Sequence, residues 1–285
     1  MSSAQHPRRW PQRLALGWLI ALAALALAAP WLPLPDVELM DAQARLKAPA
    51  WNAAPVLGTD PLGRDLAARV LAGARVSLLV GVLGALVALL VGVPYGATAG
   101  LLGGRADRSM MRAADALESV PMVVIVLFLL ALLQEYRAEL AALGIGRMHV
   151  FLAAVGLLFW LPAARVARAE TLRLRGQAFV LAAQAGGAPR RRVLARHVLP
   201  NLAPSIGTLL MLTLPRVVLM EAFLSFLGLG VEPPAVSWGI LAADGMAALN
   251  PLVDCWWLIA VPSFFLVASL WALDVLARAV AARER

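Results

Sequence analysis

The chain has 285 residues, of which 61% are hydrophobic and 15% are charged, and it carries a net charge of +8. Soluble proteins average roughly 45–50% apolar and about 25% charged residues, so this composition excludes an ordinary soluble domain and indicates a membrane protein. The arginines interrupt apolar stretches and do not form one basic face, which argues against a nucleic-acid-binding protein.

Six stretches are long and apolar enough to cross a bilayer, since about 20 residues of helix span about 30 Å of hydrocarbon. They predict an all-α integral membrane protein with six transmembrane helices, at Leu14–Leu32, Val76–Leu101, Met111–Leu133, His149–Ala167, Ile206–Leu227 and Trp256–Leu276. The first stretch follows a basic segment, as a signal peptide would. Its length exceeds the about 7–15 residues of a signal-peptide core, which favours an uncleaved anchor.

The placement of basic residues predicts the orientation of these helices. With a cytoplasmic N-terminus, 17 arginines fall on the inner side and seven basic residues on the outer side. Cytoplasmic loops are enriched in basic residues, so we expect both termini inside the cell. The expected segments are a cytoplasmic tail (1–13), an anchor (14–32), a periplasmic linker and helix (33–75), a membrane core (76–276) and a second cytoplasmic tail (277–285).

The outer segment approaches the second span through the sequence LGTDPLGRD. Asp60 followed by Pro61 is typical of a helix start, and Asp65 and Arg69 would then lie one turn apart on that helix. Asp60 and Asp65 make a poor metal site, because Arg64 lies between them in the sequence. Three further residues, Trp238, Trp256 and Trp257, are interpreted as aromatic side chains of the outer membrane interface.

The segment FVLAAQAGGAPRRRVLARHVLPN, residues 179–201, predicts a cytoplasmic helix–turn–helix. Gly186 and Gly187 end the first helix, Pro189 begins the second, and Pro200 is expected to stop it before the fifth span. The arginines here also fit a simpler role in setting topology or binding anionic lipid. Topology needs only charges, however, so the glycine pair and the amphipathic second helix favour docking against another protein.

This segment resembles the cytoplasmic coupling motif of binding-protein-dependent ABC importer permeases. Ala182, Ala183, Gly187, Leu199 and Pro200 fall on the spacing of that motif, whereas Leu181 replaces its first Glu and His197 its Ile. Those departures occur in the peptide and nickel permeases. The stretches LGTDPLGRDLAARVLAGARVSL and EAFLSFLGLGVEPPAVSWG are also similar to the C-type subunit of oligopeptide and dipeptide permeases.

The resemblance implies a type I importer core with cytoplasmic coupling helices, in which loop 168–205 contacts the ATPase. It implies a second homologous permease subunit, two ATP-binding cassette subunits that use ATP and Mg, and a periplasmic substrate-binding protein, all in the bacterial inner membrane or beside it. The ATPase-coupling residues that follow are Ala182, Ala183, Gly186, Gly187, Arg191, Arg196, Leu199 and Pro200.

Two charges lie within or near the fifth span, where an ionised group is costly and indicates function. Arg216 and Glu221 are five residues apart, about 140° around a helix, so a direct ion pair is not expected. With Pro215, which would kink the helix, they are candidates for the translocation path. Arg216 would meet an anionic group such as a peptide carboxylate; the alternative is that it reaches the membrane surface or contacts the partner subunit.

The sequence thus predicts a transporter subunit and no enzyme. The one lysine, Lys47, lacks the glycines of a phosphate-binding loop, and the single cysteine, Cys255, and three scattered histidines form no metal cluster, so no cofactor is expected in this chain. An intramembrane protease lacks its catalytic set here. A nonconducting membrane scaffold remains a remote alternative, and peptides, nickel chelates and glutathione-like molecules all remain possible substrates.

Overall fold

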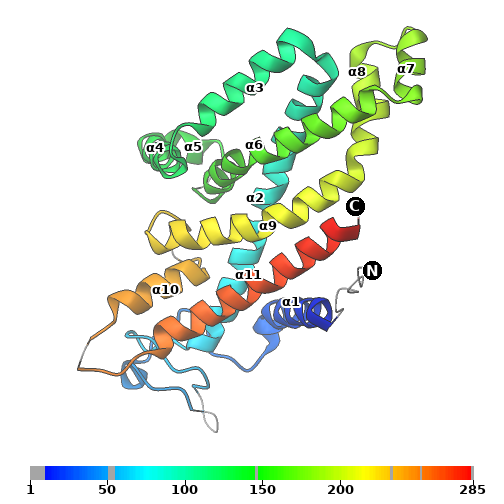
Figure 1. Ribbon diagram of the computed structural model, residues 1–285. Helices are drawn as coiled ribbons and strands as arrows, with labels where there is room; N and C mark the ends of the chain where they lie inside the picture. Colours follow the sequence, from blue (N-terminus) through cyan, green and yellow to red (C-terminus); the bar gives the residue numbers. More distant parts are fainter. Residues whose placement is uncertain (1–9, 51–54, 145–146, 232–233, 251, 284–285) are drawn as a thin grey trace. The chain divides into compact units, whose positions relative to one another are not determined.

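The computed structural model describes residues 10–50, 55–144, 147–231, 234–250 and 252–283, so most of the predicted cytoplasmic tail 1–13 and the end of the tail 277–285 lie outside the described residues. The regular structure is helical, as predicted (Figure 1). The helices are α1 (Trp10–Ala28), α2 (Leu66–Leu102), α3 (Gly104–Glu118), α4 (Met122–Glu135), α5 (Arg137–Ala142), α6 (Arg147–Arg175), α7 (Ala178–Ala185), α8 (Arg190–Val193), α9 (Ala203–Phe226), α10 (Trp238–Ala247) and α11 (Trp257–Arg283).

Five helical stretches in the described residues are long and apolar enough to cross a membrane: Trp10–Trp31, Leu66–Leu102, Met148–Arg175, Arg190–Phe226 and Trp257–Ala282. They match five of the six predicted spans. The predicted third span, Met111–Leu133, is wrong as one continuous helix, because α3 ends at Glu118 and α4 begins at Met122. Pro121 lacks a backbone N–H and disfavours helical geometry at the residue before it, so the chain bends between α3 and α4.

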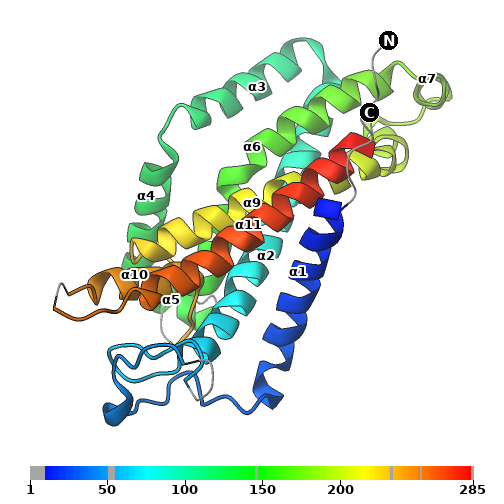
Figure 2. The ribbon, with the colours of Figure 1, turned by 60° about the horizontal axis from the view of Figure 1, so that its bottom comes forward.

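The chain divides into two compact units, one formed by residues 1–79 and 218–283 and the other by residues 80–217. In the first unit, α1 lies antiparallel to α11, so the start of α1 and the end of α11 lie at the same end of this unit (Figures 1 and 2). Trp18 of α1 donates a hydrogen bond from Nε1 to Ser269 Oγ at 3.1 Å and packs edge-on against Phe264. The predicted anchor is therefore packed against the last span.

The core of the first unit includes two of the tryptophans expected at the membrane interface. Trp238 is fully buried and donates from Nε1 to the Val70 carbonyl at 3.2 Å. Trp257 is also buried and donates to the Thr59 carbonyl at 3.2 Å. The interfacial prediction is wrong for both, because tertiary packing supplies a carbonyl acceptor for each indole N–H; Trp256 alone is exposed, at 58%.

The predicted start of the second helix is also corrected. Asp60 does not cap it; its Oδ1 accepts from the backbone N–H of Leu62 and of Arg64, which closes a turn. Helix α2 begins after Asp65, whose Oδ1 accepts from the Ala68 N–H at 2.9 Å and so performs the capping. The carboxylate of Asp65 is thus occupied, and Arg69, which lies one turn further along the chain, does not pair with it.

Arg69 instead joins an ionic cluster in which Arg69 and Asp60 are buried and Asp244 is partly exposed. Its Nη1 lies 2.6 Å from Asp60 Oδ2, and its Nη2 lies 3.2 Å from Asp244 Oδ2 on α10. Arg64 contacts the same Asp60 oxygen at 2.6 Å. The cluster ties the outer segment, the start of α2 and α10 to one another within the first unit.

In the second unit, α2 and α6 approach so closely that their backbones touch. Gly92, Gly96 and Gly100 line the contact, and a Cβ built at Gly96 would lie 1.9 Å from the Ala164 carbonyl oxygen. Small residues at a spacing of four allow such contact between membrane helices, where packing replaces the hydrophobic effect as the driving force. This contact fixes the position of α6, whose end leads into the predicted coupling loop.

Candidate functional site

The predicted helix–turn–helix is confirmed at α7 and α8. Gly187 has a φ of +77°, and the Ala188 N–H donates to the Ala183 carbonyl at 3.0 Å while the Gly187 N–H donates to the Gln184 carbonyl at 3.0 Å. These two bonds form a Schellman motif, in which a glycine in the left-handed conformation satisfies the last carbonyls of a helix. Pro189 occupies the N-cap position of α8, so the second helix begins at this proline, as predicted, although its side chain makes no capping hydrogen bond.

Pro200 does not stop the second helix, contrary to the prediction. After α8 the chain continues through a π-helical turn (Leu194–Val198) and a 3-10 turn (Leu199–Leu202) directly into α9. The Leu199 N–H donates to the Leu194 carbonyl across the π turn. The changed pitch accommodates a proline that cannot donate its own backbone hydrogen bond, so the helix changes geometry without ending.

The two faces of this segment differ. Val180, Val193, Val198 and Leu202 are buried in an apolar cluster with residues of α2 and α6. Six of the motif residues are exposed, namely Ala182, Gly186, Gly187, Arg191, Arg196 and Pro200, whereas Ala183 and Leu199 are half-buried and pack against the cluster. The predicted coupling residues therefore lie along α7, α8 and the two turns that follow, on an apolar base.

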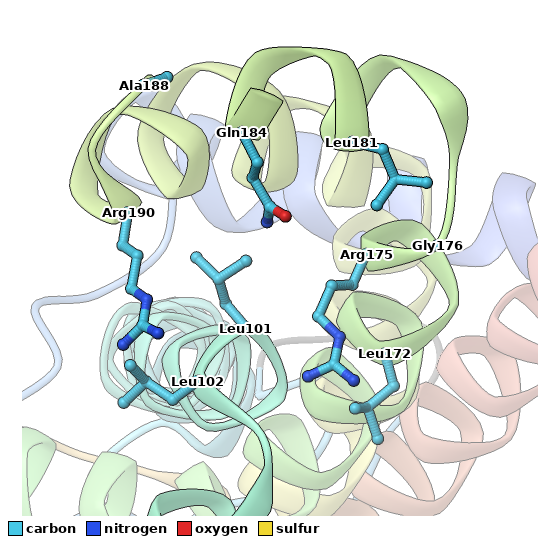
Figure 3. Close-up of a pocket in the computed structure, with 9 residues that line it drawn as sticks. All are labelled: Leu101, Leu102, Leu172, Arg175, Gly176, Leu181, Gln184, Ala188 and Arg190. Atoms are coloured by element: carbon cyan, nitrogen blue, oxygen red, sulfur yellow. The ribbon is translucent and has the colours of Figure 1, made fainter. Parts of the chain in front are cut away.

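A cavity of about 650 Å³ lies beneath α7, and Figure 3 shows its lining. The side chains of Leu181 and Gln184 from α7 face it together with Arg175 and Leu172 from the end of α6 (Figure 3). Its other lining residues are Leu101, Leu102, Gly176, Ala188 and Arg190. Sequence reasoning did not single out Arg175 or Gln184, because neither lies on the motif spacing and only the folded hairpin brings them together.

Two arginines of α6 form ion pairs with α3 that the sequence did not predict. Arg168 binds Asp107 through two hydrogen bonds, of which Nη2 to Oδ2 measures 2.7 Å. Arg165 contacts Glu118 and also Asp115, the latter at 2.8 Å. The hydrogen bond from Arg168 holds the pKa of Asp107 below its ordinary value, so this carboxylate stays ionised at neutral pH.

The two membrane charges predicted for the translocation path have different surroundings. Glu221 is fully buried and accepts hydrogen bonds from Ser77 Oγ at 2.8 Å and from Ser225 Oγ at 2.7 Å. Ser77 Oγ also accepts from the Trp238 N–H at 3.3 Å, so the carboxyl group belongs to a buried polar network. Hydroxyl donors satisfy Glu221 without an ion pair to Arg216, consistent with the expectation that the two do not pair.

Arg216 is exposed and lines a second cavity, whose walls come from the α3–α4 junction and from α6. Pro215 lies inside α9 next to it. Among the described residues, no group of three or more His, Cys, Asp or Glu side chains is arranged to hold a metal ion.

Comparison of the sequence with known proteins identifies the family of this chain. The family described as "Binding-protein-dependent transport system inner membrane component" matches residues 92–285. The chain is 35% identical to the oligopeptide transport system permease protein OppC of Haemophilus influenzae over 94% of this chain and 82% of that protein. It is 38% identical to the dipeptide permease DppC of Bacillus subtilis over 77% of this chain and 64% of that protein.

The name of a third relative indicates a different substrate. The nickel transport system permease protein NikC of Escherichia coli is 34% identical over 95% of this chain and 92% of that protein. The family and the apolar helices together describe a multi-pass protein of the inner membrane. The chain belongs to the family of inner membrane components of binding-protein-dependent transport systems.

Proposed function

We propose that this chain is one of two permease subunits of an ATP-driven importer and that it forms part of the translocation path for peptides. A periplasmic binding protein delivers the peptide, and two separate ATPase subunits hydrolyse ATP with Mg. Both termini lie in the cytoplasm in this arrangement, which the antiparallel packing of α1 and α11 supports. The chain itself moves between inward-open and outward-open states without performing chemistry.

The observation that carries the coupling role is the hairpin of α7 and α8. The hairpin exposes Arg191 and Arg196, and Leu181 is 51% exposed at the cavity that it lines with Arg175. Exposed arginines and an accessible large apolar side chain suit a protein partner, since such residues contribute most to the binding energy of interfaces. The apolar base of the hairpin transmits a movement of α7 to α2 and α6, which it contacts directly.

The peptide substrate is proposed from the relatives, since the oligopeptide and dipeptide permeases match the chain with 35% and 38% identity. The nickel permease is nearly as similar, so nickel chelates are the second candidate, and glutathione-like molecules are a further one. A nonconducting scaffold is the remaining alternative. The hairpin of α7 and α8 argues against it, because a scaffold does not need a site through which an ATPase drives a conformational change.

Reconstitution of the chain with its partner permease, its ATPase subunits and its binding protein in vesicles tests the proposal. We expect ATP-dependent uptake of a radiolabelled dipeptide or oligopeptide that the binding protein retains. The same vesicles are supplied with a radiolabelled nickel chelate in parallel. Uptake of the chelate without uptake of peptide would replace peptide by nickel chelate as the substrate. The absence of any uptake by a fully assembled complex would favour the nonconducting scaffold.

A further inference from the structure

The cavity next to Arg216 has the composition of a ligand site. It has a volume of about 600 Å³, within the range of about 300–1,000 Å³ typical of small-molecule sites. Its walls are mainly apolar and come from the α3–α4 junction and α6: Leu117, Val120, Ile125, Leu157, Leu158 and Trp160. Its charged lining residues are Glu118 and Arg216.

These two charges differ in whether a neighbouring group already neutralises them. Glu118 accepts hydrogen bonds from Arg165, including one from Nη1 to Oε1 at 3.3 Å, and Arg165 also binds Asp115. Arg216 forms no hydrogen bond or ion pair with any residue that the structure describes, and its side chain is exposed. The cavity therefore presents one unneutralised guanidinium beside apolar walls.

An unpaired arginine within a membrane span is energetically unfavourable unless water or a ligand contacts its guanidinium group. Arg216 lies near the middle of α9, within the apolar stretch Arg190–Phe226. A charged side chain at such a depth is stable when it faces a water-filled cavity or an anion, and it marks substrate pathways for that reason. The planar guanidinium fork matches a carboxylate through two parallel hydrogen bonds.

We propose that Arg216 binds the C-terminal carboxylate of the transported peptide while the apolar walls around Trp160 hold the adjoining side chain. This inference rests on the proposed peptide-transport function. A lipid phosphate offers the same anionic chemistry, but it is not the ligand inferred here. The site would select for a free carboxylate in the membrane, after the binding protein has released the peptide.

The test measures uptake by the complete reconstituted transporter of two labelled peptides that have the same sequence and differ only in a C-terminal carboxylate or amide. The ratio of the two rates is compared between wild type and Arg216→Gln, so the preference of the binding protein cancels. We expect the acid-to-amide ratio to fall about tenfold or more in Arg216→Gln, because glutamine removes the charge and the two parallel hydrogen bonds to the carboxylate. Arg216→Lys, which keeps the charge, should retain most of the ratio.

Arg112→Gln is the matched control, because it removes an exposed positive charge from α3 outside the cavity and should leave the ratio unchanged. An unchanged ratio in Arg216→Gln would overturn the carboxylate site while leaving peptide transport intact. An equal loss for both peptides that depends on anionic lipid would assign Arg216 to lipid instead. Failure of the wild type to transport either peptide would contradict the proposed function itself.

A measurement on the wild-type complex covers the case in which Arg216→Gln does not assemble. The acid peptide carries a photoreactive side chain next to its C-terminus, and the cross-linked residues are identified by mass spectrometry. We expect labelling of cavity residues such as Trp160 and Leu157, and weaker labelling with the amide. Cross-links that avoid this cavity with both peptides would overturn the inference.

Discussion

Arg168 of α6 donates two hydrogen bonds to the Asp107 carboxylate of α3, one from Nε and one from Nη2, which lies 2.7 Å from Oδ2. Asp107 is buried, whereas Arg168 remains partly accessible. The pair fixes the loop between α2 and α3 to the helix that leads into the hairpin of α7 and α8. A bidentate contact of this kind constrains orientation as well as distance.

Loss of this pair should destabilise the protein measurably. Asp107→Asn removes the charge and leaves Arg168 without its carboxylate, which should cost about 2 kcal/mol, the size of a hydrogen bond to a charged group. Asp274→Asn is the control, because the pair of Asp274 with Arg278 is exposed and such pairs contribute about 0–1 kcal/mol. Thermal unfolding of the purified complex in detergent measures both; equal effects of the two substitutions would contradict the prediction.

The same pair predicts a pH dependence. The pKa of Asp107 is lowered on folding, so its stabilising effect is present above the unfolded value of 3.8 and is lost as the pH falls through the lower folded value. The difference in unfolding temperature between wild type and Asp107→Asn should therefore be constant from about pH 6 to pH 8 and should shrink below about pH 4. If the difference in unfolding temperature disappeared between pH 6 and pH 8, a group other than Asp107 would be responsible and the prediction would be wrong.

Gly187 is predicted to be needed for its backbone conformation. Its φ of +77° disfavours any other residue by about 1–2 kcal/mol, although a Cβ there would meet no atom of this chain within 4 Å. Gly187→Ala, and more strongly Gly187→Val, should weaken co-purification of the ATPase subunits and reduce uptake while insertion into the membrane stays normal. The matched control is Gly207→Ala in α9, because Gly207 has no positive φ and a Cβ there would also meet no atom within 4 Å.

Two adjacent tryptophans should differ strongly in their contribution to stability. Trp257→Ala removes a buried ring and its hydrogen bond to the Thr59 carbonyl, and such a change costs about 3–5 kcal/mol. Trp256→Ala removes a ring that is 58% exposed and should have a much smaller effect. Unfolding temperatures of the two variants in the same detergent test this order, and a larger loss for Trp256 would refute it.

The proposed topology predicts which loops a membrane-impermeant thiol reagent can reach in intact cells. Leu252 lies in the loop before α11 and is 91% exposed, so Leu252→Cys should be labelled from outside. The native Cys255 is buried and should give little background. Arg192→Cys, on the exposed side of α8, should be labelled only after the membrane is opened. The opposite pattern would reverse the orientation.

The local sequence determined the helical class, most of the membrane spans and the turn between α7 and α8. These features depend on interactions within one segment: apolar runs of sufficient length are stable in lipid only as helices, and a glycine pair followed by proline ends one helix and begins another. The prediction of one continuous helix over Met111–Leu133 was wrong for a reason that is also local, because Pro121 indicates a break at that position in the sequence.

The tertiary structure alone decided the partners of polar and aromatic side chains. The pairing of Arg69 with Asp244, the hydrogen bonds that Trp238 and Trp257 donate to the Val70 and Thr59 carbonyls, and the hydrogen bond from Ser77 to Glu221 join residues far apart in the chain. A buried donor or acceptor must find a partner wherever the fold brings one close, and spacing along the sequence does not specify that partner. For the same reason, only the folded second unit placed Arg216 in an apolar cavity with Trp160.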